Sequence, residues 1–246
     1  MWCSLGCQSG GDGPLDGLLD AFTPQSPRQA AADAFNVFDA DRRRRAVAAI
    51  NASPFGGERP YVRMYRLLAT DPDATVRASA AAALGDHGSP EDTDLLIPML
   101  GDEVGFVRWQ AARALQKVHD PAAIDALIEV VDNDDDADAR AAAVYALGQY
   151  DSPSAFDAAV SGLLDPDFAV ASNAEVTLQT LTGQDLGAEP ADWLAWADGR
   201  RDRLFVDRRA YGYRPYQPTP GLLARAVFWR SEPELELREP QGMASP

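Results

Sequence analysis

The sequence predicts an all-α fold: a right-handed α-solenoid of about five helix pairs, followed by an irregular C-terminal tail. Two observations predict it. A frame of 14 residues that opens with Asp occurs four times, and its closing residues are Leu84, Leu115, Leu147 and Leu178. The resulting period of 31 or 32 residues is typical of stacked repeats. Within each frame, apolar residues recur at helical spacing and share one face of a helix.

The four frames differ in detail but keep the same key positions. They are DPDATVRASAAAAL (71–84), DEVGFVRWQAARAL (102–115), DDDADARAAAVYAL (134–147) and DPDFAVASNAEVTL (165–178). Alanine stands four residues before each closing leucine, which lets neighbouring helices approach closely. The opening Asp is where the sequence predicts a helix N-cap. Arg77, Arg108 and Arg140 stand seven residues before the leucine, and with the aspartates they predict a ladder between neighbouring units.

Shorter apolar segments precede the frames and complete the helix pairs. They are Arg59–Ala69, Glu91–Leu100, Pro121–Val131 and Pro153–Leu164, and the last three have proline at or near their start, where a helix tolerates it. The segment 39–50 keeps Arg43, Ala46 and Ile50 in the register of the frame. It predicts a degenerate first copy, with residues 25–38 as its leading helix. We therefore expect the solenoid to cover residues 28–198.

These frames resemble HEAT repeats, specifically the short alanine-rich class found in bacterial proteins and in phycobilisome-lyase-type subunits. The motif that carries the resemblance is D-x(4)-V-R-x(2)-A-x(2)-A-L, repeated over roughly residues 28–198. The resemblance implies a binding platform made of antiparallel helix pairs. It also leaves a second class of function open, an accessory subunit of an enzyme such as a lyase, although nothing in the chain marks a chromophore site.

Composition and motifs limit the function further. The net charge is −16, which argues against nucleic acid as a partner because the chain repels phosphates. A hydrophobic content of 46% suffices for one elongated domain with a continuous core. The sequence contains no P-loop, dinucleotide-binding glycine motif, nucleophile elbow or zinc-protease motif. We therefore expect a non-enzymatic protein with no catalytic residue and no cofactor.

Two groups of residues could suggest a metal site, and neither supports one. Cys3 and Cys7 are the only cysteines, and His87 and His119 lie far from them in the sequence, so four zinc ligands are not at hand. The acidic run 132–138, DNDDDAD, lacks the glycine and glutamate that a calcium loop needs at its sixth and twelfth positions. We expect this run to be a solvated acidic turn.

Residues 1–27 are predicted to form a flexible N-terminal tether. The Ser-Leu-Gly before Cys7 and the polar run after it resemble the end of a lipoprotein signal, which predicts lipidation of Cys7. The protein is then expected in the cell envelope, either lipid-anchored or periplasmic. Only six residues precede Cys7, too few for the charged and apolar regions of a signal. A plain disordered tail, a local disulfide and a cytoplasmic location are the alternatives. Since no apolar run reaches the roughly 18 residues of a spanning helix, we expect membrane contact only through a lipid anchor.

The segment after the fifth unit predicts the end of the stack. Gly183 and Gly187 end the preceding helix, and Pro190 begins a short one that carries Trp193 and Trp196 on one face. This segment resembles the closing part of bacterial cell-envelope HEAT-repeat proteins, which implies that the tryptophans seal the open end.

Residues 199–246 are rich in proline and aromatic residues and predict an extended tail. Phe228 and Trp229 are the side chains that we expect to dock on the solenoid if the tail folds back.

Candidate binding residues lie on the face opposite the core, six and two positions before the closing leucine. They are Trp109 and Arg113 in the third unit and Tyr145 in the fourth. Because second helices of HEAT units line the concave side, we expect the three to cluster at its centre. Trp, Tyr and Arg dominate binding energy at interfaces, so the cluster predicts that a protein or peptide partner binds there. The chain itself is expected to be a monomer. The alternative is that the C-terminal tail, or packing between helices, covers them.

Overall fold

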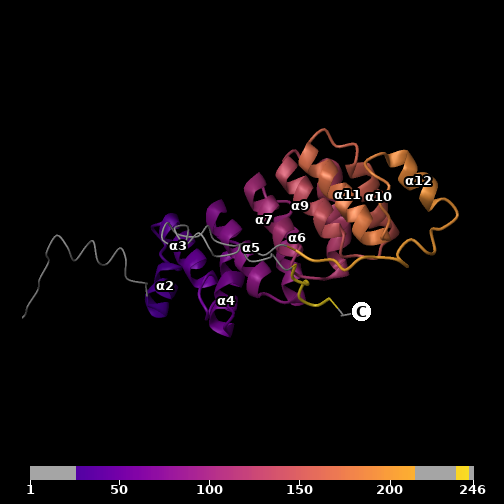
Figure 1. Ribbon diagram of the computed structural model, residues 1–246. Helices are drawn as coiled ribbons and strands as arrows, with labels where there is room; N and C mark the ends of the chain where they lie inside the picture. The colour runs from indigo at the N-terminus through magenta and orange to yellow at the C-terminus, as the bar shows by residue number, and fades with distance from the viewer. Residues whose placement is uncertain (1–25, 214–236, 244–246) are drawn as a thin grey trace, which may run out of the picture.

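The computed structural model describes residues 26–213 and 237–243, and the secondary structure in them is mainly α-helical (Figure 1). Five antiparallel pairs follow one another: α2 (Pro27–Asp33) with α3 (Ala40–Asn51), α4 (Arg59–Leu68) with α5 (Ala74–His87), α6 (Thr93–Met99) with α7 (Gly105–Leu115), α8 (Ile124–Asn133) with α9 (Ala137–Leu147), and α10 (Pro153–Gly162) with α11 (Phe168–Thr182). A 3-10 helix at Pro90–Asp92 precedes α6, and a second at Pro121–Ala123 precedes α8. The α-solenoid is confirmed.

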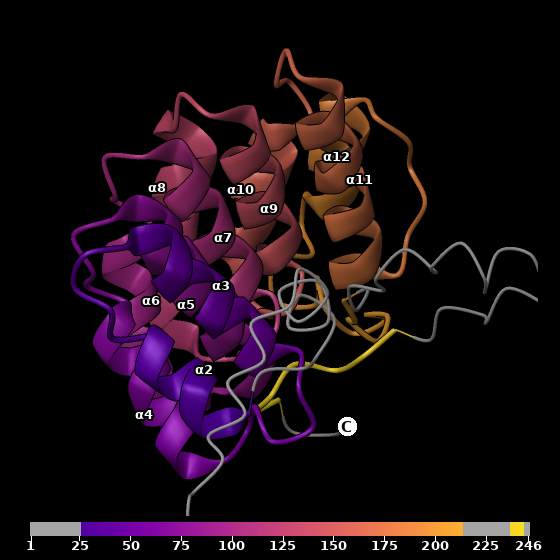
Figure 2. The same ribbon diagram turned by 90° about the vertical axis from the view of Figure 1, so that its left-hand side faces the viewer.

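The second helix of each pair contacts the second helices of its neighbours, and the pairs stack in chain order (Figures 1 and 2). The alanines four positions before the closing residue are all buried in this layer: Ala46, Ala80, Ala111, Ala143 and Ala174. At one crossing, a methyl group on Gly85 would lie only 2.8 Å from the Cα of Ala114. The first helices bury larger side chains, among them Leu96, Leu127 and Phe156. We call the side formed by α3, α5, α7, α9 and α11 the inner face.

The second helices begin later than the sequence predicts. Their N-cap residues stand two positions after the opening residue of the frame, and Asp39, Asp73, Asp136 and Asp167 accept backbone N–H groups of the first turn. The opening Asp was therefore wrongly predicted to be the cap. Its carboxylate accepts the backbone N–H two residues further on and turns towards the preceding unit.

The opening Asp of each frame instead pairs with an arginine of the unit before it. The pairs are Arg43–Asp71, Arg77–Asp102, Arg108–Asp134 and Arg140–Asp165, each with two hydrogen bonds of 2.7–3.0 Å. The remaining guanidinium nitrogen of each arginine donates to a backbone carbonyl of the turn before its own helix. This Arg–Asp ladder confirms the predicted one. It ends at Asp165 because Ala171 stands where the next arginine would be.

The first helix is shorter than the predicted segment 25–38. The helix α2 ends at Asp33, and Asn36 starts a turn in which its Oδ1 accepts the N–H of Phe38 at 3.0 Å. The carbonyl of Asn36 also accepts from Arg43, so the ladder holds this turn in place. Phe38 is left 96% exposed.

The C-terminal end of the stack is closed by α12 (Pro190–Ala197). Gly183 ends α11 in the left-handed region, with φ of 73°, where a side chain would be strained. Trp193 is fully buried, and its Nε1 donates to the carbonyl of Gly187 at 2.7 Å. Trp196 is partly buried against the same core. The structure thus shows Trp193 sealing the end, as the sequence predicts.

The described part of the C-terminal tail (199–213 and 237–243) runs back from α12 towards the middle of the stack (Figure 1). The N–H of Arg209 donates to the carbonyl of Thr180, and Tyr211 is buried. Further along, Gln241 forms a parallel bridge with Val118. Phe228 and Trp229, predicted to dock, lie outside the described residues, as does Cys7. No helix among the described residues is long and apolar enough to cross a membrane.

Candidate functional site

Trp109 and Arg113 form a fixed pair on the inner face. They lie one turn apart on α7, and the guanidinium carbon of Arg113 lies 4.8 Å from the centroid of the Trp109 ring. This is a cation–π contact, in which the ring attracts the cation electrostatically. The ring of Phe106 lies 5.4 Å from that of Trp109, and Trp109 also packs against the core. These contacts hold the indole of Trp109 in place, and the indole in turn positions the guanidinium of Arg113.

Beside this pair lies a pocket of about 250 Å³ between α5 and α7, which we call the Arg113 pocket. Its lining residues come from three units: Asn51, Ala82, Asp86, Gln110, Arg113, Ala114 and Lys117. The Nζ of Lys117 lies 2.6 Å from one carboxylate oxygen of Asp86, and Asn51 donates to the other oxygen at 2.9 Å. Asp86 and Lys117 thus neutralise each other. Arg113 forms no ion pair with any residue that the structure describes, so the pocket keeps one positive charge.

Tyr145 is not part of this open group. Its Oη donates to the carbonyl of Gly212 at 2.7 Å, and its ring lies 5.6 Å from that of the buried Tyr211. The position of Tyr145 in the repeat is equivalent to that of Arg113, but the returning tail covers it. The alternative interpretation, that the tail covers candidate residues, therefore holds for Tyr145. Trp109 and Arg113 make no such contact with the described part of the tail.

The repeat positions predicted to be open are not open in every unit. Ala78 and Ala141 occupy the same position as Trp109, and both are buried. The carbonyl of Ala141, in the fourth unit, accepts a hydrogen bond from the side chain of Asn173 on α11 of the fifth unit. The position of Ala141 therefore lies at the seam between neighbouring second helices. The alanines there are buried in the seam, whereas the larger side chain of Trp109 is only partly buried against the core.

The tail contacts two residues that line the Arg113 pocket, Asp86 and Lys117, and the sequence did not predict this. The N–H of Gln241 donates to the carbonyl of Lys117 at 2.7 Å, and its side chain donates to the carbonyl of Asp86 at 3.3 Å. The ring of Tyr213 lies 5.9 Å from the ammonium of Lys117. Lys117 is the only lysine of the chain, and this was the one sequence signal that could have singled it out as a site residue.

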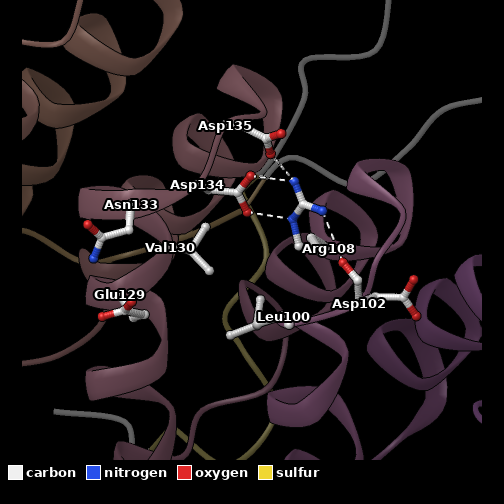
Figure 3. Close-up of a pocket in the computed structure, with 9 residues that line it drawn as sticks. Leu100, Asp102, Arg108, Glu129, Val130, Asn133, Asp134 and Asp135 are labelled. Atoms are coloured by element: carbon white, nitrogen blue, oxygen red, sulfur yellow. Dashed lines mark hydrogen bonds and ion pairs between the residues drawn. The ribbon is translucent and has the colours of Figure 1, made fainter.

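A second hollow, of about 300 Å³, lies between the third and fourth units on the edge that carries the ladder (Figure 3). Its arginine is already occupied: Arg108 binds Asp134, Asp135 and the carbonyl of Asp102. Burial raises the pKa of Asp134, but the hydrogen bonds from Arg108 and the N–H of Asp136 outweigh it and lower the pKa overall. This hollow is part of the Arg–Asp ladder, and its one lining cation, Arg108, is already bound, so it offers no free positive charge to an anionic ligand.

The comparisons with known proteins agree with this architecture. A family model described as HEAT repeats matches residues 61–148 and 124–194, together more than half of the chain. The chain belongs to the HEAT-repeat family. No curated protein matches the sequence of this HEAT-repeat protein.

Solved structures show the same fold. A chain from the complex of CpcE and CpcF of phycocyanin lyase, from a Nostoc species, has a TM-score of 0.57 at 22% identity, over 77% of this chain and 72% of that one. An engineered protein has a TM-score of 0.50 at 17% identity, over 67% and 84%. The Escherichia coli protein YibA has a TM-score of 0.50 at 19% identity, over 70% and 66%. Identities this low show a shared fold and leave the function open.

Proposed function

We propose that this HEAT-repeat protein is a non-enzymatic scaffold that holds a protein or peptide segment on its inner face, at Trp109 and Arg113. The observation that carries the proposal is the state of Arg113. The arginines of the ladder all bind carboxylates, whereas Arg113 stacks on Trp109 beside a pocket and has no ion pair among the described residues. Trp and Arg held in this way are the residue types that dominate binding at interfaces.

Replacing Trp109 with alanine tests the proposal. Peptides are first selected from a random display library on the full-length chain, and the affinity of the tightest is measured by fluorescence anisotropy. We expect Trp109→Ala to weaken binding about 30-fold, equivalent to about 2 kcal/mol, because it removes both the contact surface and the support of Arg113. Urea denaturation should show that the variant remains folded, since Trp109 is only partly buried.

The chain offers a matched control. Trp196 also carries an arginine, with the guanidinium carbon of Arg200 5.5 Å from its ring, but this pair lies on the closing segment of the stack. Trp196→Ala should bind the selected peptide within twofold of the unchanged protein. If the two variants lose affinity equally, or if neither does, the inner face at Trp109 is not the binding site.

An accessory subunit of an enzyme is the second candidate. The observation that favours it is the fold shared with chains from the CpcE and CpcF complex of phycocyanin lyase. The two candidates differ in what accompanies the protein when it is purified from its source. A visible absorption band or a stoichiometric partner enzyme favours the accessory subunit, whereas a colourless protein without either favours the scaffold.

We further propose that Cys7 carries a lipid anchor that tethers the scaffold in the cell envelope. Support comes from the small residue before Cys7 and the polar run after it. Expressed from its natural start, the protein should incorporate a palmitate analogue, Cys7→Ala should abolish the label, and Cys3→Ala should keep it. An unlabelled protein in the soluble fraction contradicts the anchor.

A further inference from the structure

We infer that the Arg113 pocket binds a carboxylate group of the held segment. The inference rests on the proposed function and names the chemistry that the inner face recognises. The pocket takes either an acidic side chain or the free C-terminus of a peptide, because both present the same planar anion.

The geometry around Arg113 suits a planar anion. The guanidinium of Arg113 lies over the Trp109 ring, and none of its N–H groups donates a hydrogen bond to a residue that the structure describes, so these donors remain for a ligand. Two parallel N–H groups match the two oxygens of a carboxylate. The same pairing is already present in the ladder, where Arg77 binds Asp102 through two hydrogen bonds of 2.7 and 2.9 Å. Arg113 has the same donors, but no carboxylate among the described residues accepts a hydrogen bond from them.

The charge of the pocket favours a monoanion over a phosphate. Three charged residues line it, and two of them, Asp86 and Lys117, are bonded to each other at 2.6 Å. The remaining charge is +1, which balances one carboxylate. A phosphate group carries close to two negative charges and would lie near the carboxylate of Asp86 without a second free cation. A carboxylate is therefore the better match.

Lys117 has a positioning role in this arrangement. It neutralises Asp86, which would otherwise repel an incoming anion, and the tail fixes it through the bond from Gln241 to its carbonyl. Removing the charge of Lys117 should weaken carboxylate binding, and removing the charge of Asp86 in the same protein should restore it. A purely structural role of Lys117 does not predict that rescue.

The experiment uses the full-length chain and short blocked peptides, with binding read from the NMR resonance of the Arg113 Nε–H group. The alanine–glutamate–alanine peptide, amidated at its C-terminus, should shift this resonance, and its glutamine counterpart should bind at least tenfold more weakly. Trialanine with a free C-terminal carboxylate shows whether a chain end also enters. A phosphoserine peptide tests the rival anion.

Variants read by the chemical shifts of neighbouring backbone amides complete the design. Arg113→Gln should lose glutamate-peptide binding at least tenfold, whereas Arg200→Gln, in the matched pair on Trp196, should leave it unchanged. Lys117→Met should weaken binding severalfold, and Asp86→Asn combined with Lys117→Met should recover it.

Three outcomes overturn the inference: equal binding of the glutamate and glutamine peptides, tighter binding of the phosphoserine peptide, or equal losses in the Arg113 and Arg200 variants. Failure of these probes is distinct from failure of the proposed function. If selected peptides still depend on Trp109 while carboxylates do not bind, the inner face is a binding site with another specificity. If Trp109→Ala has no effect on them, the proposed function itself fails.

Discussion

Replacing Trp193 with alanine is expected to lower the free energy of unfolding by about 3–5 kcal/mol. Trp193 is 0% exposed, so the substitution leaves a large cavity under α12. It also removes the donor for the carbonyl of Gly187, which Nε1 meets at 2.7 Å. Urea denaturation followed by circular dichroism measures the loss.

Because each unit of a solenoid contacts only its neighbours, this loss should begin at the C-terminal end. Native-state hydrogen exchange should show reduced protection in α10, α11 and α12, while α5 and α7 keep theirs. Trp196→Ala, on the same helix but only partly buried, should cost less than half as much. Equal costs for the two tryptophans, or a uniform loss of protection, would show that Trp193 does not seal the stack.

The sequence predicts the fold because its signals are local and repeated. The closing leucines at 84, 115, 147 and 178 are all fully buried, as their common place in the frame requires. The N-caps were less predictable, because three of the four frames carry Asp both at the opening position and two residues later. Either could cap a helix. The choice is made by a contact between units, since the opening Asp is held by the preceding arginine.

The candidate site was predictable only in part. Trp109 and Arg113 are four residues apart on one helix, so their contact follows from helical geometry. Tyr145 has the equivalent place in its unit, but the tail that covers it arrives from 67 residues further along the chain. No repeat period carries that information. The same holds for the pair of Lys117 with Asp86, which joins two units through side chains outside the common motif.

Replacing Arg140 with methionine is expected to lower the free energy of unfolding by about 3 kcal/mol at neutral pH. The side chains of Arg140 and Asp165 are only 14% and 10% exposed, so the variant leaves Asp165 as a largely buried charge without its cation. The carbonyl of Asp134 loses its donor as well. Arg44→Met is the control, because its pair with Asp41 is 3.4 Å long and exposed, and we expect it to cost less than about 1 kcal/mol.

The cost of losing Arg140 should also depend on pH, with a sign that the structure fixes. The hydrogen bond from Arg140, opposed by burial, lowers the pKa of Asp165 in the folded protein. A lowered folded pKa adds stability above the unfolded value, which is about 4 for aspartate, and that stability is lost as the pH falls through the folded value. The unchanged protein should therefore lose its advantage over Arg140→Met as the pH falls below about 4. Urea denaturation of both proteins at pH 7 and pH 3 measures the difference, and an equal difference at the two pH values would show that the bond between Arg140 and Asp165 does not stabilise the ladder as a charged pair.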